Sequence, residues 1–159
     1  MGRTKKGTPP TYRRHRPTGK AVVTIDGRDI YLGAYDTPAS KAEYARLIAE
    51  HAITGAVSRE AVDADGILVN EVLAAFWRFA QSWYVKHGQP TNELDAYRKL
   101  MSDVKSLYGH TAASAFGPLA FKTIRQAWID RGQSRPTVNK NAGRLMRIFK
   151  WAVSEEVAL

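Results

Sequence analysis

The chain has 159 residues, 44% of them hydrophobic, which is enough for one ordinary domain or two small ones with real cores. Its 24 Lys and Arg against 15 Asp and Glu give a formal net charge of +9, which favours a polyanionic partner, nucleic acid before a membrane. The absence of cysteine excludes disulfides and thiolate zinc sites. Because no apolar run resembles a membrane span or a signal peptide, we expect a cytoplasmic protein without a membrane partner.

The charge is unevenly distributed along the chain. Residues 1–33 contain eight basic and two acidic side chains, whereas residues 34–66 contain three and six. The end of this acidic stretch includes the run GAVSREAVDADG, which has no aromatic residue and little to bury. We therefore predict a first domain over 1–53, a linker over 54–66 and a second domain over 67–159.

The first predicted element is a β-hairpin, in which the strands AVVTI and RDIYL flank Asp26-Gly27. This dipeptide is typical of a type I′ turn, which needs positive φ at both positions. With that turn Ile25 lies opposite Arg28, and one face of the hairpin is apolar. The apolar face comprises Ala21, Val23, Ile25, Ile30 and Leu32, and the other face comprises Lys20, Val22, Thr24, Asp29 and Tyr31.

A third strand and a helix are predicted on either side of the hairpin. The run TYRRHR can pair with the hairpin and place either Arg14 and Arg16 or Arg13 and His15 on its polar face. Residues 36–51 are typical of a helix capped by Thr37, with an apolar stripe at Tyr44, Ala45, Ile48 and Ala52. Such a helix would cover the apolar face and leave a basic face that fits the major groove of DNA or is merely solvated.

The rest of the chain is predicted to be a four-helix bundle, so the fold class is α+β. Apolar side chains recur at helical spacing in four segments separated by Gly and Pro signals: 67–88, 91–109, 118–132 and 134–157. Opposite the apolar stripe of the last segment, Lys140, Gly143, Arg147 and Lys150 fall together and Arg144 flanks them. Arg98 and Lys105 form a second basic strip, on the segment 91–109. These strips, with Thr137 and Asn139, indicate phosphate and base contacts.

The chain resembles the tyrosine site-specific recombinases, the phage-integrase family, over nearly its whole length. Residues 12–50 are similar to the small AP2-like module that binds arm sites, and residues 67–159 are similar to the helical, SAM-like core-binding domain. The resemblance in the last helix is carried by Thr137-Val138-Asn139 and by a Phe149-x-x-Ala152 pattern. It implies that the chain binds double-stranded recombination-site DNA for DNA integration, and that the full-length protein oligomerises on DNA while this chain alone can be a monomer.

Two sets of DNA-binding residues follow from this resemblance. It directs toward arm DNA the side chains of Tyr12, Arg14, Arg16, Lys20, Thr24 and Tyr31. It directs toward core DNA those of Arg98, Lys105, Thr137, Asn139, Lys140, Arg144 and Arg147. The charge pattern adds Arg13 and Lys150.

The catalytic signature of the family is missing from this sequence. None of the four histidines has an arginine three places later, and the chain stops after the last core-binding helix. We therefore expect this chain to have no catalytic residue, cofactor or metal, and expect the full-length protein to cut and rejoin DNA through a tyrosine. Two alternatives are a standalone DNA-binding regulator or accessory factor of a mobile element, and an RNA-binding protein. A small enzyme is the least favoured class, because no paired carboxylates, metal-ligand spacing or Gly-rich phosphate loop occurs.

Overall fold

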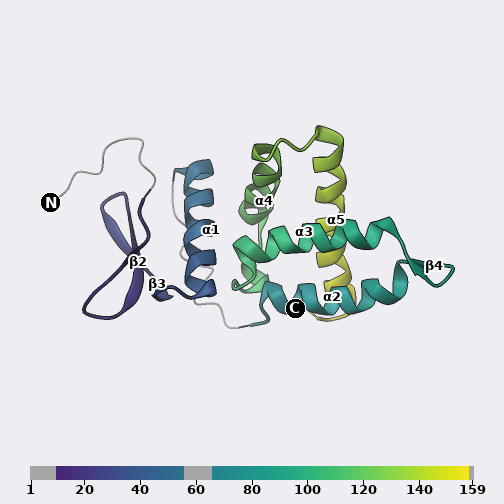
Figure 1. Cartoon of the computed structure of the whole chain (residues 1–159), viewed down its shortest axis with the longest axis horizontal. Coiled ribbons are helices and arrows are strands. Elements are labelled where there is room, and N and C mark those ends of the chain that lie inside the picture. The colour runs from purple at the N-terminus through teal and green to yellow at the C-terminus, as the bar shows by residue number, and fades with distance from the viewer. Residues whose placement is uncertain (1–9, 56–65, 158–159) are drawn as a thin grey trace. The chain divides into compact units, whose positions relative to one another are not determined.

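The computed structural model describes residues 10–55 and 66–157 (Figure 1). The chain divides into two compact units, Met1–Val57 and Ser58–Leu159. The first consists of a three-stranded antiparallel sheet and a helix, and the second is a helical bundle. The predicted α+β class is therefore confirmed. Residues 56–65, most of the predicted linker, lie outside the described residues.

The sheet of the first unit has the strand order β1 (Arg13–Arg14), β2 (Lys20–Ile25) and β3 (Arg28–Ala34). Asp26 and Gly27 connect β2 to β3 with φ angles of 50° and 76°, which is the positive region that the predicted type I′ turn requires. Ile25 lies opposite Arg28, as predicted. The turn chemistry thus fixes the register at this end of the hairpin.

The register changes at the other end of the hairpin, which the sequence did not predict. Val22 lies opposite Tyr31, but Lys20 lies opposite Ala34, so β3 holds one extra residue. Gly33 occupies this bulge with φ 91°, a conformation that glycine adopts without a steric penalty. The predicted pairing of Ala21 with Leu32 is therefore displaced, although both side chains remain buried.

Helix α1 (Pro38–Thr54) packs on the sheet and begins where it was predicted to begin. The hydroxyl of Thr37 accepts a hydrogen bond from the backbone N–H of Ser40 at 3.2 Å, which caps the helix. The predicted stripe is correct at Tyr44 and Ile48 but wrong at Ala52, which is exposed. The small core of this unit is made of Ala21, Val23, Ile25, Leu32 and Leu47.

The second unit contains the four predicted helices, α2 (Val69–Trp83), α3 (Asn92–Tyr108), α4 (Pro118–Asp130) and α5 (Arg135–Ser154), with a 3₁₀ turn, η1 (Ala113–Ala115), before α4. Each helix contributes one apolar stripe to a single core. Its largest fully buried side chains are Phe76, Tyr97, Leu100, Ile124, Trp128, Leu145 and Ile148.

Helix α2 is shorter than predicted. It ends at Trp83, and a two-stranded hairpin of β4 (Val85–Lys86) and β5 (Gln89–Pro90) follows where the sequence indicated further helix. His87 and Gly88 form the turn with φ angles of 52° and 75°, which a helix cannot accommodate. Trp83 falls at the apolar spacing of the segment 67–88, which predicts a core position, but it is 68% exposed.

Candidate nucleic-acid interface

The pairing of β1 decides which side chains share the open face of the sheet, the face that α1 does not cover. Arg13 lies opposite Val22, whereas Arg14 lies opposite Ala21, a core residue. Directly opposed residues point to the same side of a sheet, so Arg13 belongs to the open face and Arg14 does not. Of the two alternatives, the structure favours Arg13 and His15.

Arg13 is neutralised on this face by Asp29. Its Nη2 donates hydrogen bonds to Asp29 Oδ1 and to Thr24 Oγ1, both at 2.9 Å. Thr24 in turn donates to the same carboxylate oxygen at 2.5 Å. The Thr24 hydrogen bond, followed by the Arg13 charge, lowers the pKa of Asp29 below its ordinary value. Two predicted DNA-binding side chains, Arg13 and Thr24, are thus tied into a cross-strand network.

An aromatic pair lies beside that network. The rings of His15 and Tyr31 meet edge to face with centroids 5.3 Å apart, and Tyr31 is 46% exposed. His15 Nδ1 is 2.8 Å from the hydroxyl of Thr18. Tyr31 keeps the exposure that a predicted base contact needs.

The remaining positive charge of the sheet is exposed. Across residues 10–55, no acidic side chain forms an ion pair with any of four exposed cations, Arg14, Arg16, Lys20 and Arg28. Arg28 was not among the predicted contacts, although its place beside the turn is visible in the sequence. Unpaired cations of this kind are the groups that contact phosphates.

Tyr12 has a structural role that the sequence did not indicate. Its hydroxyl lies 2.7 Å from Ser40 Oγ and accepts a hydrogen bond from the Asp36 N–H at 2.8 Å. Its ring stacks on Tyr35, with centroids 5.2 Å apart, and meets Tyr44 edge-on. Tyr12 therefore joins the edge of the sheet to the start of α1, and its hydroxyl is already used.

Arg144, predicted to contact DNA, is held inside the bundle. Its Nε and Nη2 donate to the two carboxylate oxygens of Glu93, each at 2.8 Å, and its Nη1 donates to Asn141 at 2.9 Å. The Arg144 hydrogen bond lowers the pKa of Glu93 below its ordinary value. This bidentate pair joins α5 to α3, and it occupies the Nε–Nη2 edge of the guanidinium, which a phosphate would otherwise contact.

Arg147 remains at the surface in a fixed position. Its Nη1 donates to Tyr97 Oη at 3.2 Å and lies 3.5 Å from Tyr84 Oη. Burial, reinforced by the hydrogen bond with Tyr84, raises the pKa of Tyr97 to about 12, so the Tyr97 phenol stays neutral near pH 7. The two hydroxyls therefore position the guanidinium without neutralising its charge.

Exposed side chains surround Arg147 along α5. Between residues 66 and 157, neither Lys140 nor Arg147 forms an ion pair with an acidic side chain. Gly143 lies between them with open space where a side chain would be. We call Thr137, Asn139, Lys140, Gly143 and Arg147, all of them exposed, the α5 strip.

A polar hollow adjoins the start of α5. It has a volume of about 400 Å³ and lies between α3 and α5. Lys99 and Gln133 line it together with Thr137 of the α5 strip. Lys99 is an exposed cation that the helical pattern left outside both predicted strips.

The second predicted strip lies on a different face of α3. Arg98 forms an ion pair with Asp95 at 3.3 Å and sits 5.4 Å from the ring of Trp77 on α2. Lys105 is exposed. At roughly 100° per residue, Arg98 and Lys105 lie about a third of a turn from Glu93, which contacts α5. The two strips therefore do not merge into one cluster.

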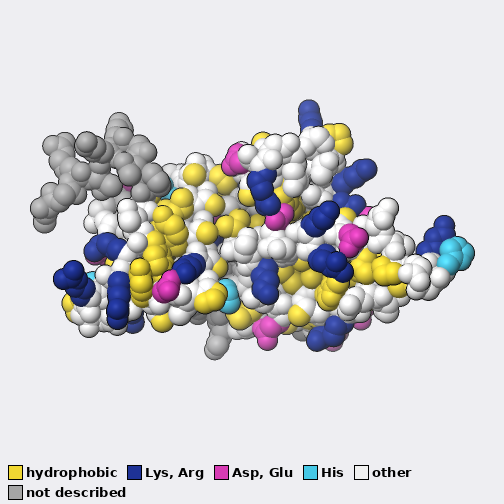
Figure 2. Space-filling view, in the orientation of Figure 1, with side chains coloured by type: hydrophobic (Ala, Val, Ile, Leu, Met, Phe, Trp, Pro, Cys, Tyr) yellow, Lys and Arg dark blue, Asp and Glu magenta, His cyan; other side chains and the backbone are white. Residues whose placement is uncertain are grey.

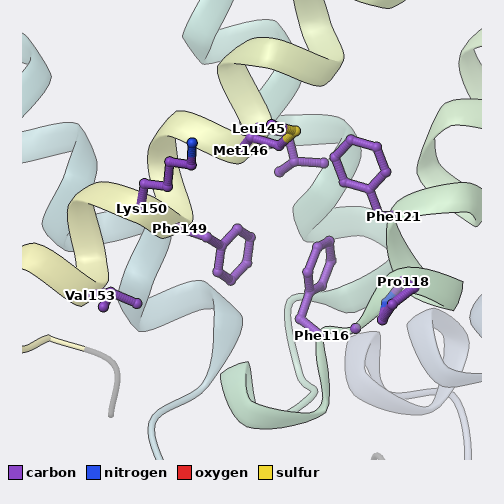
Figure 3. A pocket seen from close by; sticks show the side chains of 9 residues that line it. Phe116, Pro118, Phe121, Leu145, Met146, Phe149, Lys150 and Val153 are labelled. Carbon is purple, nitrogen blue, oxygen red and sulfur yellow. The ribbon is translucent and has the colours of Figure 1, made fainter.

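Lys150 borders an apolar groove rather than the middle of the α5 strip. The groove has a volume of about 510 Å³ and lies between α4 and α5 (Figure 3). Phe116 and Phe149 stack at its floor with centroids 4.5 Å apart. Its other lining side chains are Pro118, Phe121, Leu145, Met146, Lys150 and Val153.

Within the described ranges, no three His, Cys, Asp or Glu side chains gather as they would around a metal ion, and no helix has the length and apolar character to cross a membrane. The chain matches no protein-family model, no curated protein and no solved structure.

Proposed function

We propose that this chain binds double-stranded DNA through both of its units, as the DNA-recognition part of a protein similar to the tyrosine recombinases. The observation that carries the proposal is the α5 strip, where no acidic side chain of residues 66–157 pairs with Lys140 or Arg147 and a glycine between them leaves the helix backbone open. A duplex can approach a helix closely at such a position, and the hydroxyl and amide groups at the helix start add donors.

The first unit has a different fold from the helical bundle, and it also supports DNA binding. A three-stranded sheet with one face covered by a helix leaves the other face free to enter the major groove. Lys20 and Tyr31 supply side chains there, Arg16 is exposed in the turn before β2, and within residues 10–55 Asp29 pairs with Arg13 alone. In this proposal Arg16 and Lys20 bind phosphates while Tyr31 approaches the bases.

We further propose that this chain does not itself cleave DNA. No histidine in the sequence has an arginine three positions later, so the catalytic pattern of the recombinases is missing. Incubation with supercoiled DNA should therefore give neither a covalent protein–DNA adduct nor relaxed product, and the detection of either would overturn this part of the proposal.

Salt dependence of binding tests the main proposal. Binding of the chain to a fixed duplex, measured by fluorescence anisotropy, should weaken with salt at a slope of log K against log salt near −5, from about six phosphates at roughly −0.9 each. Lys140→Ala and Arg147→Ala should each reduce the magnitude of the slope by about 1. Lys122→Ala removes the same charge from an exposed position on α4 and serves as the control.

Three outcomes would contradict DNA binding by the α5 strip. They are a slope unaffected by both variants, an equal effect of Lys122→Ala, and displacement of the DNA by an equal concentration of duplex RNA. The last would favour the RNA-binding alternative, because the wide minor groove of RNA is contacted through its 2′-hydroxyls.

A further inference from the structure

Helix α2 ends in a stack of aromatic rings whose outermost ring is exposed. Trp83, the last residue of the helix, is 68% exposed. Its ring stacks on Phe79 with centroids 5.5 Å apart and an angle of 24° between the planes, and Phe79 stacks on Trp151 at 5.2 Å and 26°. Three nearly parallel rings therefore form a column, and Trp83 is its outer end.

The column is anchored in the bundle. Trp151 lies on α5 and meets the buried ring of Phe76 edge-on, with centroids 5.4 Å apart. The inner rings thus hold the indole of Trp83 in place, although the indole itself is mostly in solvent. Exposed aromatic surface that is already ordered loses little conformational freedom when a ligand binds to it.

The charge around Trp83 favours an anionic ligand. The sequence has no acidic residue from Val72 to Asn92, and this stretch contains Arg78, Lys86 and His87. The last two lie at the turn of the β4–β5 hairpin, where basic and histidine side chains gather (Figure 2). Glu93, which follows the stretch, is paired with Arg144.

The column also borders the α5 strip. Tyr84 is the residue after Trp83, and its hydroxyl oxygen lies 3.5 Å from Nη1 of Arg147. Trp151 follows Arg147 by four residues, so both lie on the same side of α5. A nucleic acid bound along the α5 strip would therefore reach the hairpin and the outer ring of the column.

From this geometry we propose that Trp83 stacks on an unpaired nucleobase of the DNA, with Lys86 binding the adjoining phosphate. The inference rests on the proposed DNA binding by the second unit. An intact duplex covers the faces of its bases, whereas a gap, a bulge or a single strand exposes them. A base placed on Trp83 would continue a column of parallel rings that the protein already contains.

The test compares two DNAs and three variants of the whole chain. One DNA is an uninterrupted duplex, and the other is the same duplex with a tract of three unpaired thymines. The variants are Trp83→Ala, Trp83→Phe, which keeps an aromatic face, and Met146→Ala, which removes a 48% exposed apolar side chain from the groove between α4 and α5. Affinities are measured by anisotropy at one salt concentration, and thermal unfolding checks that each variant is folded.

Stacking predicts a selective loss. Trp83→Ala should weaken binding to the DNA with the unpaired tract roughly thirtyfold, the middle of the range that alanine substitution of stacking residues gives, and change binding to the uninterrupted duplex less than twofold. Trp83→Phe should recover most of the loss, and Met146→Ala should change neither affinity.

Several results would overturn the inference. Equal losses on the two DNAs would make Trp83 a general structural residue. If Trp83→Ala binds both DNAs as tightly as the unaltered chain, the exposed indole does not contact DNA and has another partner, such as a protein. Failure of the unaltered chain to bind the uninterrupted duplex would overturn the proposed function itself, which separates the two failures.

Discussion

Arg144 on α5 and Glu93 on α3 form a bidentate ion pair in which both N···O distances are 2.8 Å. The two residues are 51 positions apart in the chain, and Arg144 is mostly buried, with 18% of its side chain exposed. Of the predicted cationic DNA contacts on α5, this is the one that pairs with an acidic side chain among the described residues. Its variants can therefore separate stability from binding.

Arg144→Ala should lower the free energy of unfolding by roughly 1 to 2 kcal/mol, because it leaves the Glu93 carboxylate without its two donors in a partly buried site. A double-mutant cycle with Glu93→Gln, measured by urea unfolding, should give a coupling energy above about 0.5 kcal/mol. The salt slope of DNA binding should not change. If Arg144→Ala instead reduces the salt slope of DNA binding and leaves stability unchanged, Arg144 contacts DNA and the structural role is wrong.

The same pair predicts a pH dependence of stability. Because the pKa of Glu93 is lower in the folded chain than its ordinary value of 4.5, its contribution to stability is present above that value and is lost as the pH falls through the folded pKa. Unfolding measured at pH 7 and at stepwise lower pH should show the unaltered chain losing its advantage over Glu93→Gln below about pH 4.5. A constant difference down to pH 3 would contradict the assignment.

Features set by neighbouring residues could be predicted from the sequence. Asp26-Gly27 determines the type I′ turn, Thr37 caps α1, and the apolar spacing in each bundle segment selects its buried face. Each depends on residues within a few positions of one another. The His87-Gly88 turn also depends on neighbouring residues. However, His87 falls at the apolar spacing of the segment 67–88, so the sequence predicts a longer helix than the one that forms.

Features that depend on distant partners could not be predicted. Helical spacing places Arg144 beside Arg147 on the outer side of α5, and nothing near it in the sequence indicates that Glu93 will neutralise it. In the same way, Arg13 looks like a free cation until β1 pairs with β2 and brings Asp29 within 2.9 Å. A pattern of charge shows which side chains are outside the core, but not which of them find a partner there.

Asp29 limits the positive charge of the open sheet face, so its removal should strengthen DNA binding by the first unit. Asp29→Ala releases Arg13 and removes a carboxylate that would repel phosphates. The salt slope should become steeper by about 1, since one more cation is available. Asp36→Ala, which removes an acidic group paired with Lys41, is the matched control, and anisotropy with the same duplex is the measurement. Equal effects of the two variants would mean that only net charge matters.

Gly143 offers the sharpest steric test, because stability and binding should change in opposite directions. A side chain at this position meets no heavy atom within 4 Å, so Gly143→Leu fits the folded chain and should raise its stability by up to about 1 kcal/mol through helix propensity. If the duplex lies against α5 here, the added bulk separates Lys140 and Arg147 from their phosphates and weakens DNA binding at least tenfold.

Gly143→Ala is the control for this variant, because it supplies the same gain in helix propensity with a single methyl group. It should be as stable as Gly143→Leu and bind DNA nearly as well as the unaltered chain. Thermal unfolding and anisotropy measure the two properties on the same samples. If Gly143→Leu binds as tightly as Gly143→Ala, the duplex does not approach this face, and the remaining cations of α5 serve only to solvate the helix.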